Sequence, residues 1–196
     1  FLTASISEKF DVVGEESVNI FFEINEGDLS TLKSFTISGE EALSEKKIRK
    51  YLNLKIGAPF NQIKIRQNIL KLQREYQKIG NLLVQINESY IPNEDIDLLL
   101  IIQEGPTVKI DEVIIDGLLN LDTSFVEREH VLKSGMIYDI ELIELSQQRI
   151  FETGLFSMVN IYPVASEKGE EWSNVRIEIK EFNQREFLSE GGYYLI

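Results

Sequence analysis

The side chains that could carry out catalysis or bind a metal are few in this chain. His130 is the only histidine, and the sequence contains no cysteine. A structural zinc site is usually built from Cys and His ligands, and a Ser-His-Asp site would have to use this one histidine. No nucleophile-elbow glycine pattern surrounds any serine, and no G-x-G-x-x-G or P-loop pattern is present. The sequence therefore predicts no enzyme activity, no metal site and no bound cofactor or nucleotide.

Acidic side chains are the other groups that could bind a ligand. They gather at Glu40 and Glu41, and again at Glu167, Glu170 and Glu171. Such groups could bind a cation or a basic partner, but they are more often solvated turns. The net charge of −13 argues against a nucleic-acid partner. Trp172 follows the second acidic group, and we expect it either to contact a partner or to pack against its own domain.

The elements that position these residues are organised by an internal repeat. Gly27, Gly39 and Gly57 recur as glycines at positions 105, 117 and 135, each 78 residues later. Their surroundings recur with them: residues 18–27 align with 96–105, and residues 35–39 align with 113–117. A further copy of the strand lies at 175–181. The chain is therefore predicted to be a tandem array of one small module.

The first complete copy predicts a β-α-α-β-β module. Strands are expected at 32–37, 82–90 and 96–103. Ser44 is a plausible N-cap of a short helix, and Asn61 can cap a longer helix that ends at Gly80. The apolar residues of the longer helix are spaced for one face: Ile65, Ile69, Leu72, Tyr76 and Ile79.

The second copy repeats these sequence features with one small deletion. Strands are expected at 108–115, 159–164 and 175–180. Asp122 takes the place of Ser44 as the helix cap, with Ser124 and Glu127 as an alternative capping box. Asp139 replaces Asn61, and Gly154 ends the second helix four residues early relative to Gly80. His130 aligns with the apolar Leu52 of the first copy, so a partly buried packing role is expected for it.

The repeat also predicts the domain boundaries. Residues 1–27 are interpreted as the last two strands of a preceding module, at 1–6 and 18–25. Complete modules are expected at 28–105 and 106–182, and 183–196 as a linker to a further strand. Because a lone two-stranded ribbon is marginal in water, the first piece is expected to pack on its neighbour or to be partly disordered.

This arrangement resembles the POTRA domains of the BamA/TamA superfamily of outer-membrane β-barrel assembly proteins. The residues that carry the resemblance are the Glu-Gly pairs at 26–27 and 104–105, the strand-closing glycines at 39 and 117, the helix ends at 76–80 and 150–154, and the segment 153–159. Residues 185–194 resemble the linker and the opening of the first barrel strand. The resemblance implies an α+β fold in which a three-stranded mixed sheet carries two helices on one face. It also implies that these are the last POTRA domains before the barrel.

The resemblance implies a location at the periplasmic face of the outer membrane. The implied role is to bind and position unfolded outer-membrane proteins, or accessory proteins and lipoproteins, for insertion by a C-terminal β-barrel. The alternative is a two-partner-secretion transporter that recognises one secreted partner, and a third possibility is a structural spacer under the pore.

In POTRA domains the strand after the second helix is typically an open sheet edge, to which a client strand can be added through backbone hydrogen bonds. The candidate residues on these edges are Val84, Gln85, Ile86, Asn87, Val159, Asn160 and Ile161. Pro163 removes one donor and is expected to limit strand addition at the second edge.

Overall fold

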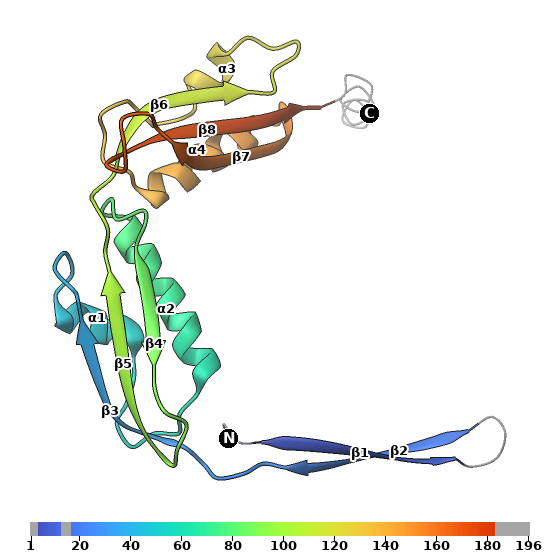
Figure 1. Cartoon of the computed structure of the whole chain (residues 1–196). Helices are drawn as coiled ribbons and strands as arrows, with labels where there is room; N and C mark the ends of the chain where they lie inside the picture. The colour runs from blue at the N-terminus through green and yellow to red at the C-terminus, as the bar shows by residue number, and fades with distance from the viewer. Residues whose placement is uncertain (1–3, 13–16, 183–196) are drawn as a thin grey trace, which may run out of the picture. The chain divides into compact units, whose positions relative to one another are not determined.

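The repeated segments fold into two copies of one β-α-α-β-β arrangement (Figure 1). The computed structural model describes residues 4–12 and 17–182. The first copy consists of β3 (Thr31–Ser38), α1 (Glu45–Leu52), α2 (Gln62–Gln77), β4 (Gln85–Ser89) and β5 (Asp95–Gln103). The second copy consists of β6 (Lys109–Asp116), α3 (Ser124–Glu127), α4 (Ile140–Glu152), β7 (Phe156–Ala165) and β8 (Trp172–Glu181). The predicted fold class is confirmed.

In both sheets the last strand of the copy lies in the middle. The strand orders are β3-β5-β4 and β6-β8-β7. The first strand of each copy is parallel to the central strand, and the hairpin partner is antiparallel to it. A parallel pair needs a long crossover, which here contains both helices of the copy. The sheets are therefore mixed, and β4 and β7, which follow the second helix of each copy, are outer strands as predicted.

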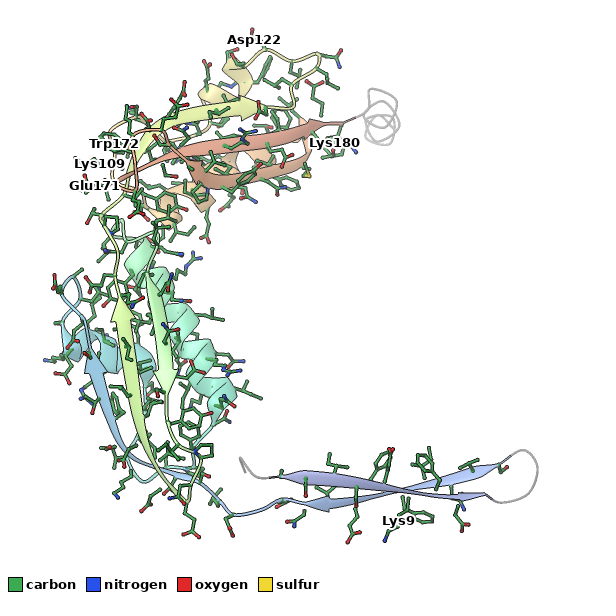
Figure 2. The ribbon with its side chains drawn as sticks, viewed as in Figure 1. Lys9, Lys109, Asp122, Glu171, Trp172 and Lys180 are labelled. Carbon is green, nitrogen blue, oxygen red and sulfur yellow. The ribbon has the colours of Figure 1, made fainter. Side chains whose placement is uncertain are left out.

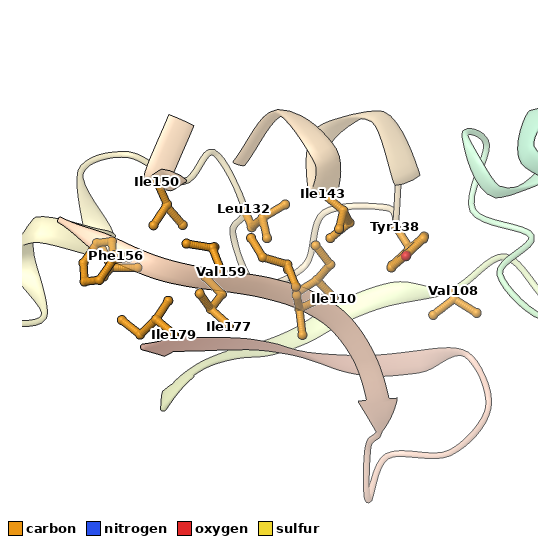
Figure 3. Packing of buried hydrophobic residues seen from close by; sticks show 13 residues of the cluster. Val108, Ile110, Leu132, Tyr138, Ile143, Ile150, Phe156, Val159, Ile177 and Ile179 are labelled. Carbon is orange, nitrogen blue, oxygen red and sulfur yellow. The ribbon is translucent and has the colours of Figure 1, made fainter. Parts of the chain in front are cut away.

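Alternating burial along the central strands shows which face of each sheet the helices cover. In β5 every second residue is buried, and in β8 the same period recurs. The buried residues of β5 are Ile96, Leu98, Leu100 and Ile102. Figure 3 shows the corresponding core of the second copy, where Ile150 and Ile143 of α4 lie over Val159, Ile177 and Ile179 of the sheet.

The two long helices begin where their capping side chains predict. The Asn61 Oδ1 atom accepts a hydrogen bond from the Lys64 N–H at 2.9 Å, and Asp139 Oδ1 accepts one from the Glu141 N–H at 2.8 Å. Four of the five apolar residues predicted on one face of α2 are buried. The fifth, Ile79, is 37% exposed because α2 ends at Gln77 and Ile79 lies in the following turn.

The short helices differ from their predicted caps. Ser44 occupies the N-cap position of α1, but its side chain makes no capping hydrogen bond. In the second copy Thr123 is the N-cap residue of α3, and Asp122 Oδ1 accepts a hydrogen bond from the Ser124 N–H at 2.9 Å. Asp122 therefore lies one residue before the N-cap position predicted for it, and Ser124 of the alternative capping box is the first residue of α3.

Residues before the first complete copy form an antiparallel ribbon of β1 (Ser5–Val12) and β2 (Val18–Asn25). The strand predicted at 1–6 was placed too early, because Ser5 pairs with Asn25 and the pairing continues to Val12. The side chains of residues 5–11 and 18–25 are exposed. The predicted linker and barrel strand at 183–196 lie outside the described residues.

By its contacts the chain divides into two compact units. The first contains the residues up to Leu72 together with Gln85–Gln103, and the second contains Gln73–Val84 and the residues from Glu104 onward. Within the second unit, Arg74 forms an ion pair with Glu144 of α4, and Lys78 Nζ lies 2.7 Å from a carboxylate oxygen of Glu141. Among the described residues, no helix combines the length and apolar character needed to cross a membrane.

Candidate strand-binding edges

In the two three-stranded sheets β3, β4, β6 and β7 lie at the edges, but β3 and β6 are partly covered. The segment after α1 pairs with the start of β3: the Gly57 N–H donates to the Leu32 carbonyl at 2.7 Å, and the Leu32 N–H donates to the Ala58 carbonyl at 3.0 Å. The segment before α4 covers the start of β6 in the same way, through Gly135 and Ile110. A register shift occurs in β3 and β6 and also at the start of β7, between Phe156 and Met158, so the covering segments are what distinguish β3 and β6. The outer edges of β4 and β7 are therefore the better candidates for strand addition.

A close contact between Gly39, which follows β3, and the central strand β5 shows in which direction the backbone groups of β4 point. A Cβ atom added at Gly39, just after β3, would lie 2.2 Å from the carbonyl oxygen of Ile102. The Ile102 carbonyl therefore points toward β3 and away from β4. Because Ile86 lies directly opposite Ile102, this is a non-hydrogen-bonded pair, and the N–H and C=O of Ile86 point to the open edge. Backbone direction alternates along a strand, so Glu88 shares this orientation.

The same reasoning shows which of the predicted residues of β4 direct their backbone groups to the open edge. Gln85 and Asn87 lie opposite Gln103 and Ile101, whose backbone groups point toward β4, so both donate into the sheet. Val84 precedes β4 and is buried. Ile86 is thus the one predicted residue of this strand that presents its backbone to the edge, and sequence reasoning missed Glu88.

In β7 two independent contacts give the backbone direction. The Phe182 N–H donates to the Leu155 carbonyl at 3.2 Å, and the Ser157 hydroxyl donates to the Lys180 carbonyl at 3.2 Å. The backbone N–H and C=O groups of the even-numbered residues of β8 therefore point toward β7. Asn160 lies opposite Glu178 and is hydrogen-bonded into the sheet.

The open edge of β7 consequently carries the backbone groups of Val159, Ile161 and Pro163. Proline has no N–H to donate to a ladder, so a proline at a position facing the open edge costs the sheet nothing. The side chains of Val159 and Ile161 are buried in the core. This edge therefore presents main-chain groups to a partner and gives little specificity for the partner's side chains.

A groove lies beside the edge of β7. It has a volume of about 390 Å³ and is lined by Val159 of β7 and by four residues of α4: Glu144, Gln147, Gln148 and Phe151. Phe151 is 54% exposed and gives the groove an apolar wall. Side chains of an added strand that point to the helix side of the sheet would enter this groove.

In the first copy an ion pair crosses the approach to β4. Arg66 of α2 bonds Glu88 of β4, with Nε and Oε1 2.7 Å apart, so an ion pair joins the helix to the edge strand. The residue 78 positions after Arg66 is Glu144, which pairs with Arg74 instead. The hydrogen bonds from Arg74 hold the pKa of the Glu144 carboxyl below its usual range, so this groove residue is anionic at neutral pH.

The residues considered for other chemistry lie apart from these edges. His130 is half-buried, and burial lowers the pKa of its imidazole. In the part of the chain that the structure describes, no group of three or more His, Cys, Asp or Glu side chains is placed to hold a metal ion. Glu40 and Glu41 lie in the bend between β3 and α1.

Trp172 begins β8 at the end of the β7–β8 hairpin, close to Lys109 and Glu171 (Figure 2). The ammonium groups of Lys109 and Lys168 lie 5.7 Å and 4.9 Å from the centre of its ring. The indole therefore contacts cations of its own module.

The two copies are tandem α+β modules, each with outer strands on both sides of its central strand. The family model described as POTRA, surface antigen variable number repeat, matches residues 30–105 and 108–181. The chain belongs to the POTRA family.

Known proteins with similar sequence or structure agree with this assignment. The outer membrane protein assembly factor BamA of Neorickettsia risticii (strain Illinois) is 24% identical over 150 residues, which are 75% of this chain and 20% of that relative. The chain thus spans about a fifth of the length of this curated relative.

Two solved structures share the fold. The POTRA3-5 structure of Haemophilus influenzae BamA superposes with a TM-score of 0.74 at 19% identity, covering 92% of this chain and 73% of that one. The structure of Haemophilus ducreyi BamA lacking POTRA domains 1-3 gives a TM-score of 0.62 at 16% identity, covering 80% of this chain and 30% of that one.

Proposed function

We propose that this chain is the periplasmic POTRA region of an outer-membrane protein assembly factor. In this role it binds unfolded outer-membrane proteins, or the accessory proteins that work with them, and positions them for insertion by a β-barrel of the same protein. Complete modules at 28–105 and 106–182 would be the last POTRA domains before that barrel. The observation that carries the proposal is the open edge of β7, with outward backbone groups at Val159 and Ile161.

An open edge suits a protein that must bind many different unfolded chains. The N–H and C=O groups of Val159 and Ile161 can pair with any extended backbone, whatever its side chains are. Specificity from side chains would be small, because the residues that present these groups bury their own side chains in the core.

We take β7 as the primary edge and β4 as the secondary one. β7 has ten residues and adjoins the groove under Phe151, whereas β4 has five residues and is tied to α2 by the Arg66–Glu88 ion pair. Pro163 shortens the usable ladder of β7, since it leaves only a carbonyl at that position.

NMR titration of the ¹⁵N-labelled chain with peptides from outer-membrane barrel strands tests the proposal. Amide shifts are expected at Val159 and Ile161 on β7, with smaller shifts at Ile86 and Glu88 on β4. Scrambled peptides that keep the apolar-polar alternation should bind with similar affinity, and added salt should weaken binding only slightly, since neutral main-chain hydrogen bonds carry it.

A matched pair of N-methylated peptides provides the control. Methyl groups on the peptide amides that face β7 should abolish binding, whereas methyl groups on the alternate amides should not. Equal binding of both methylated peptides would contradict strand addition. Tight binding of one secreted protein, with no binding of barrel-strand peptides, would favour the transporter function instead.

A further inference from the structure

An apolar cavity lies where the β7 edge ends. It has a volume of about 450 Å³ within the second unit. Its walls are formed by Leu82 and Leu83 of the loop after α2, by Val108, by Pro163 and Val164 of β7, and by Trp172 of β8. Leu83 is 51% exposed, so a large apolar side chain stands at the cavity with much of its surface in water.

The cavity is continuous with the strand-binding edge. Pro163 and Ala165 belong to both: they follow Val159 and Ile161 on the outward-facing side of β7, and Pro163 interrupts the series of outward N–H donors. A strand paired with Val159 and Ile161 would find a carbonyl but no N–H donor at Pro163. At that point, burial of a side chain in the cavity is an additional interaction that the surface offers to the same strand.

The rim of the cavity is acidic. Glu170 lines it, and Glu167 and Glu171 lie in the same turn. Among the described residues, none of these three carboxylates has an ion-pair partner. The ammonium of Lys168 pairs with Asp111, and that of Lys109 lies beside the Trp172 ring. The surroundings therefore favour a positively charged group beside the apolar one.

We propose that this cavity is an anchor site for the strand that adds to β7, and that it takes a large apolar side chain flanked by Lys or Arg. The proposal rests on the proposed function, since the occupant belongs to an extended client segment. The anchor site adds a side-chain preference to an edge that otherwise recognises only the backbone of the client. Clients with an apolar-basic pair at one end of the added strand are bound more tightly and in one register.

Trp172 provides a direct readout, because it is the only tryptophan in the chain. The test uses the chain as it stands and short alternating peptides that end in Phe-Lys, Ala-Lys or Phe-Glu. The Phe-Lys peptide should change Trp172 emission and shift the Val159 and Ile161 amides. The Ala-Lys peptide should bind about tenfold weaker with unchanged Trp172 emission, because it lacks the buried ring. The Phe-Glu peptide should also bind more weakly.

Two variants test the site from the protein side. Ala165→Phe places a ring at the cavity from an exposed position that lines it, and should remove the preference for Phe-Lys over Ala-Lys. Asn160→Phe adds the same ring on the exposed face of the same strand, away from the cavity, and should leave the preference intact. Glu170→Lys should reverse the ranking of the Phe-Lys and Phe-Glu peptides.

The two readouts separate this proposal from the proposed function. Equal affinity of the Phe-Lys and Ala-Lys peptides, with amide shifts at β7 and no change in Trp172, would overturn the anchor site and leave strand addition standing. A Trp172 response without shifts at Val159 and Ile161 would overturn the claim that the occupant is an added strand. Absence of both responses would overturn the proposed function and the anchor site together.

Discussion

The carboxylate of Glu181, the last residue of β8, accepts a hydrogen bond from the backbone N–H of Asn120 at 3.0 Å. The N–H groups of Leu119 and Leu121 bond the same carboxylate at 2.8 Å and 3.0 Å. One side chain therefore fixes the loop after β6 to the end of the central strand. These backbone donors lower the pKa of Glu181 to about 2.

We predict that Glu181→Gln destabilises the second module near neutral pH, because the amide loses the charge that strengthens these bonds. Since the folded pKa is lowered from 4.5 to about 2, the stabilisation is present above about 4.5 and is lost as the pH falls toward 2. Thermal melts across this range should show a difference from wild type that shrinks on acidification. A difference that is independent of pH would contradict the electrostatic explanation.

A second prediction concerns the glycine that closes β6. A Cβ atom at Gly117 would lie 2.0 Å from the Ile179 carbonyl oxygen, and φ is +96°. Gly135 also has positive φ, but nothing lies within 4 Å of its Cβ position. Gly135→Ala should cost about 1 kcal/mol for the backbone conformation alone. Gly117→Ala should cost at least about 2 kcal/mol more, since central β8 must also move. Similar free energies of unfolding for the two variants would contradict this packing.

These glycines show what sequence could predict. The fixed 78-residue offset between the glycines predicted the module, the order of its elements and the strands that end at a glycine. It could do so because a repeat constrains many positions at once. The outward backbone groups of Glu88 were not predictable, since in-plane direction depends on register against β5, which no residue pattern records. The cavity at Trp172 was missed for a related reason: its walls come from segments far apart in sequence, and only folding brings them together.

A third prediction tests the core of the first module. Leu72 of α2 is fully buried, whereas Leu70 on the same helix is 65% exposed. Leu72→Ala should lower the free energy of unfolding by about 2–5 kcal/mol, because it removes buried methyl groups and leaves a cavity. The matched change Leu70→Ala should stay within about 0.5 kcal/mol of wild type. Chemical denaturation of both variants measures the difference, and equal losses would refute the helix register.

A fourth prediction concerns the ribbon of β1 and β2. Pairing places Ile6, Phe10, Ile20, Phe22 and Ile24 on one face of it. The residues of β2 on this face are more than half exposed, whereas their repeat equivalents in β5 are buried beneath helices. Such a face is an association surface when nothing covers it.

The chain is therefore expected to self-associate through the ribbon in a concentration-dependent way. A fragment of residues 28–182 should be monomeric under the same conditions, and Ile20→Ser with Phe22→Ser should have the same effect in the full chain. Sedimentation velocity distinguishes these cases. Equal association of the chain and the fragment would place the contact outside the ribbon.

The last prediction concerns Pro163, which faces the open edge of β7. Pro163→Val supplies the missing N–H at that position and keeps an apolar β-forming side chain. Because this N–H would point away from β8, the variant should keep its fold and bind barrel-strand peptides more tightly, by up to about tenfold for one added hydrogen bond. Asn160→Pro is the opposite change: it removes a donor that pairs with β8, so it should lower the melting temperature of the module. Titration of both variants by NMR, with melts as a check on folding, measures the two effects. Unchanged affinity in a folded Pro163→Val variant would mean that clients do not pair with β7 at this position.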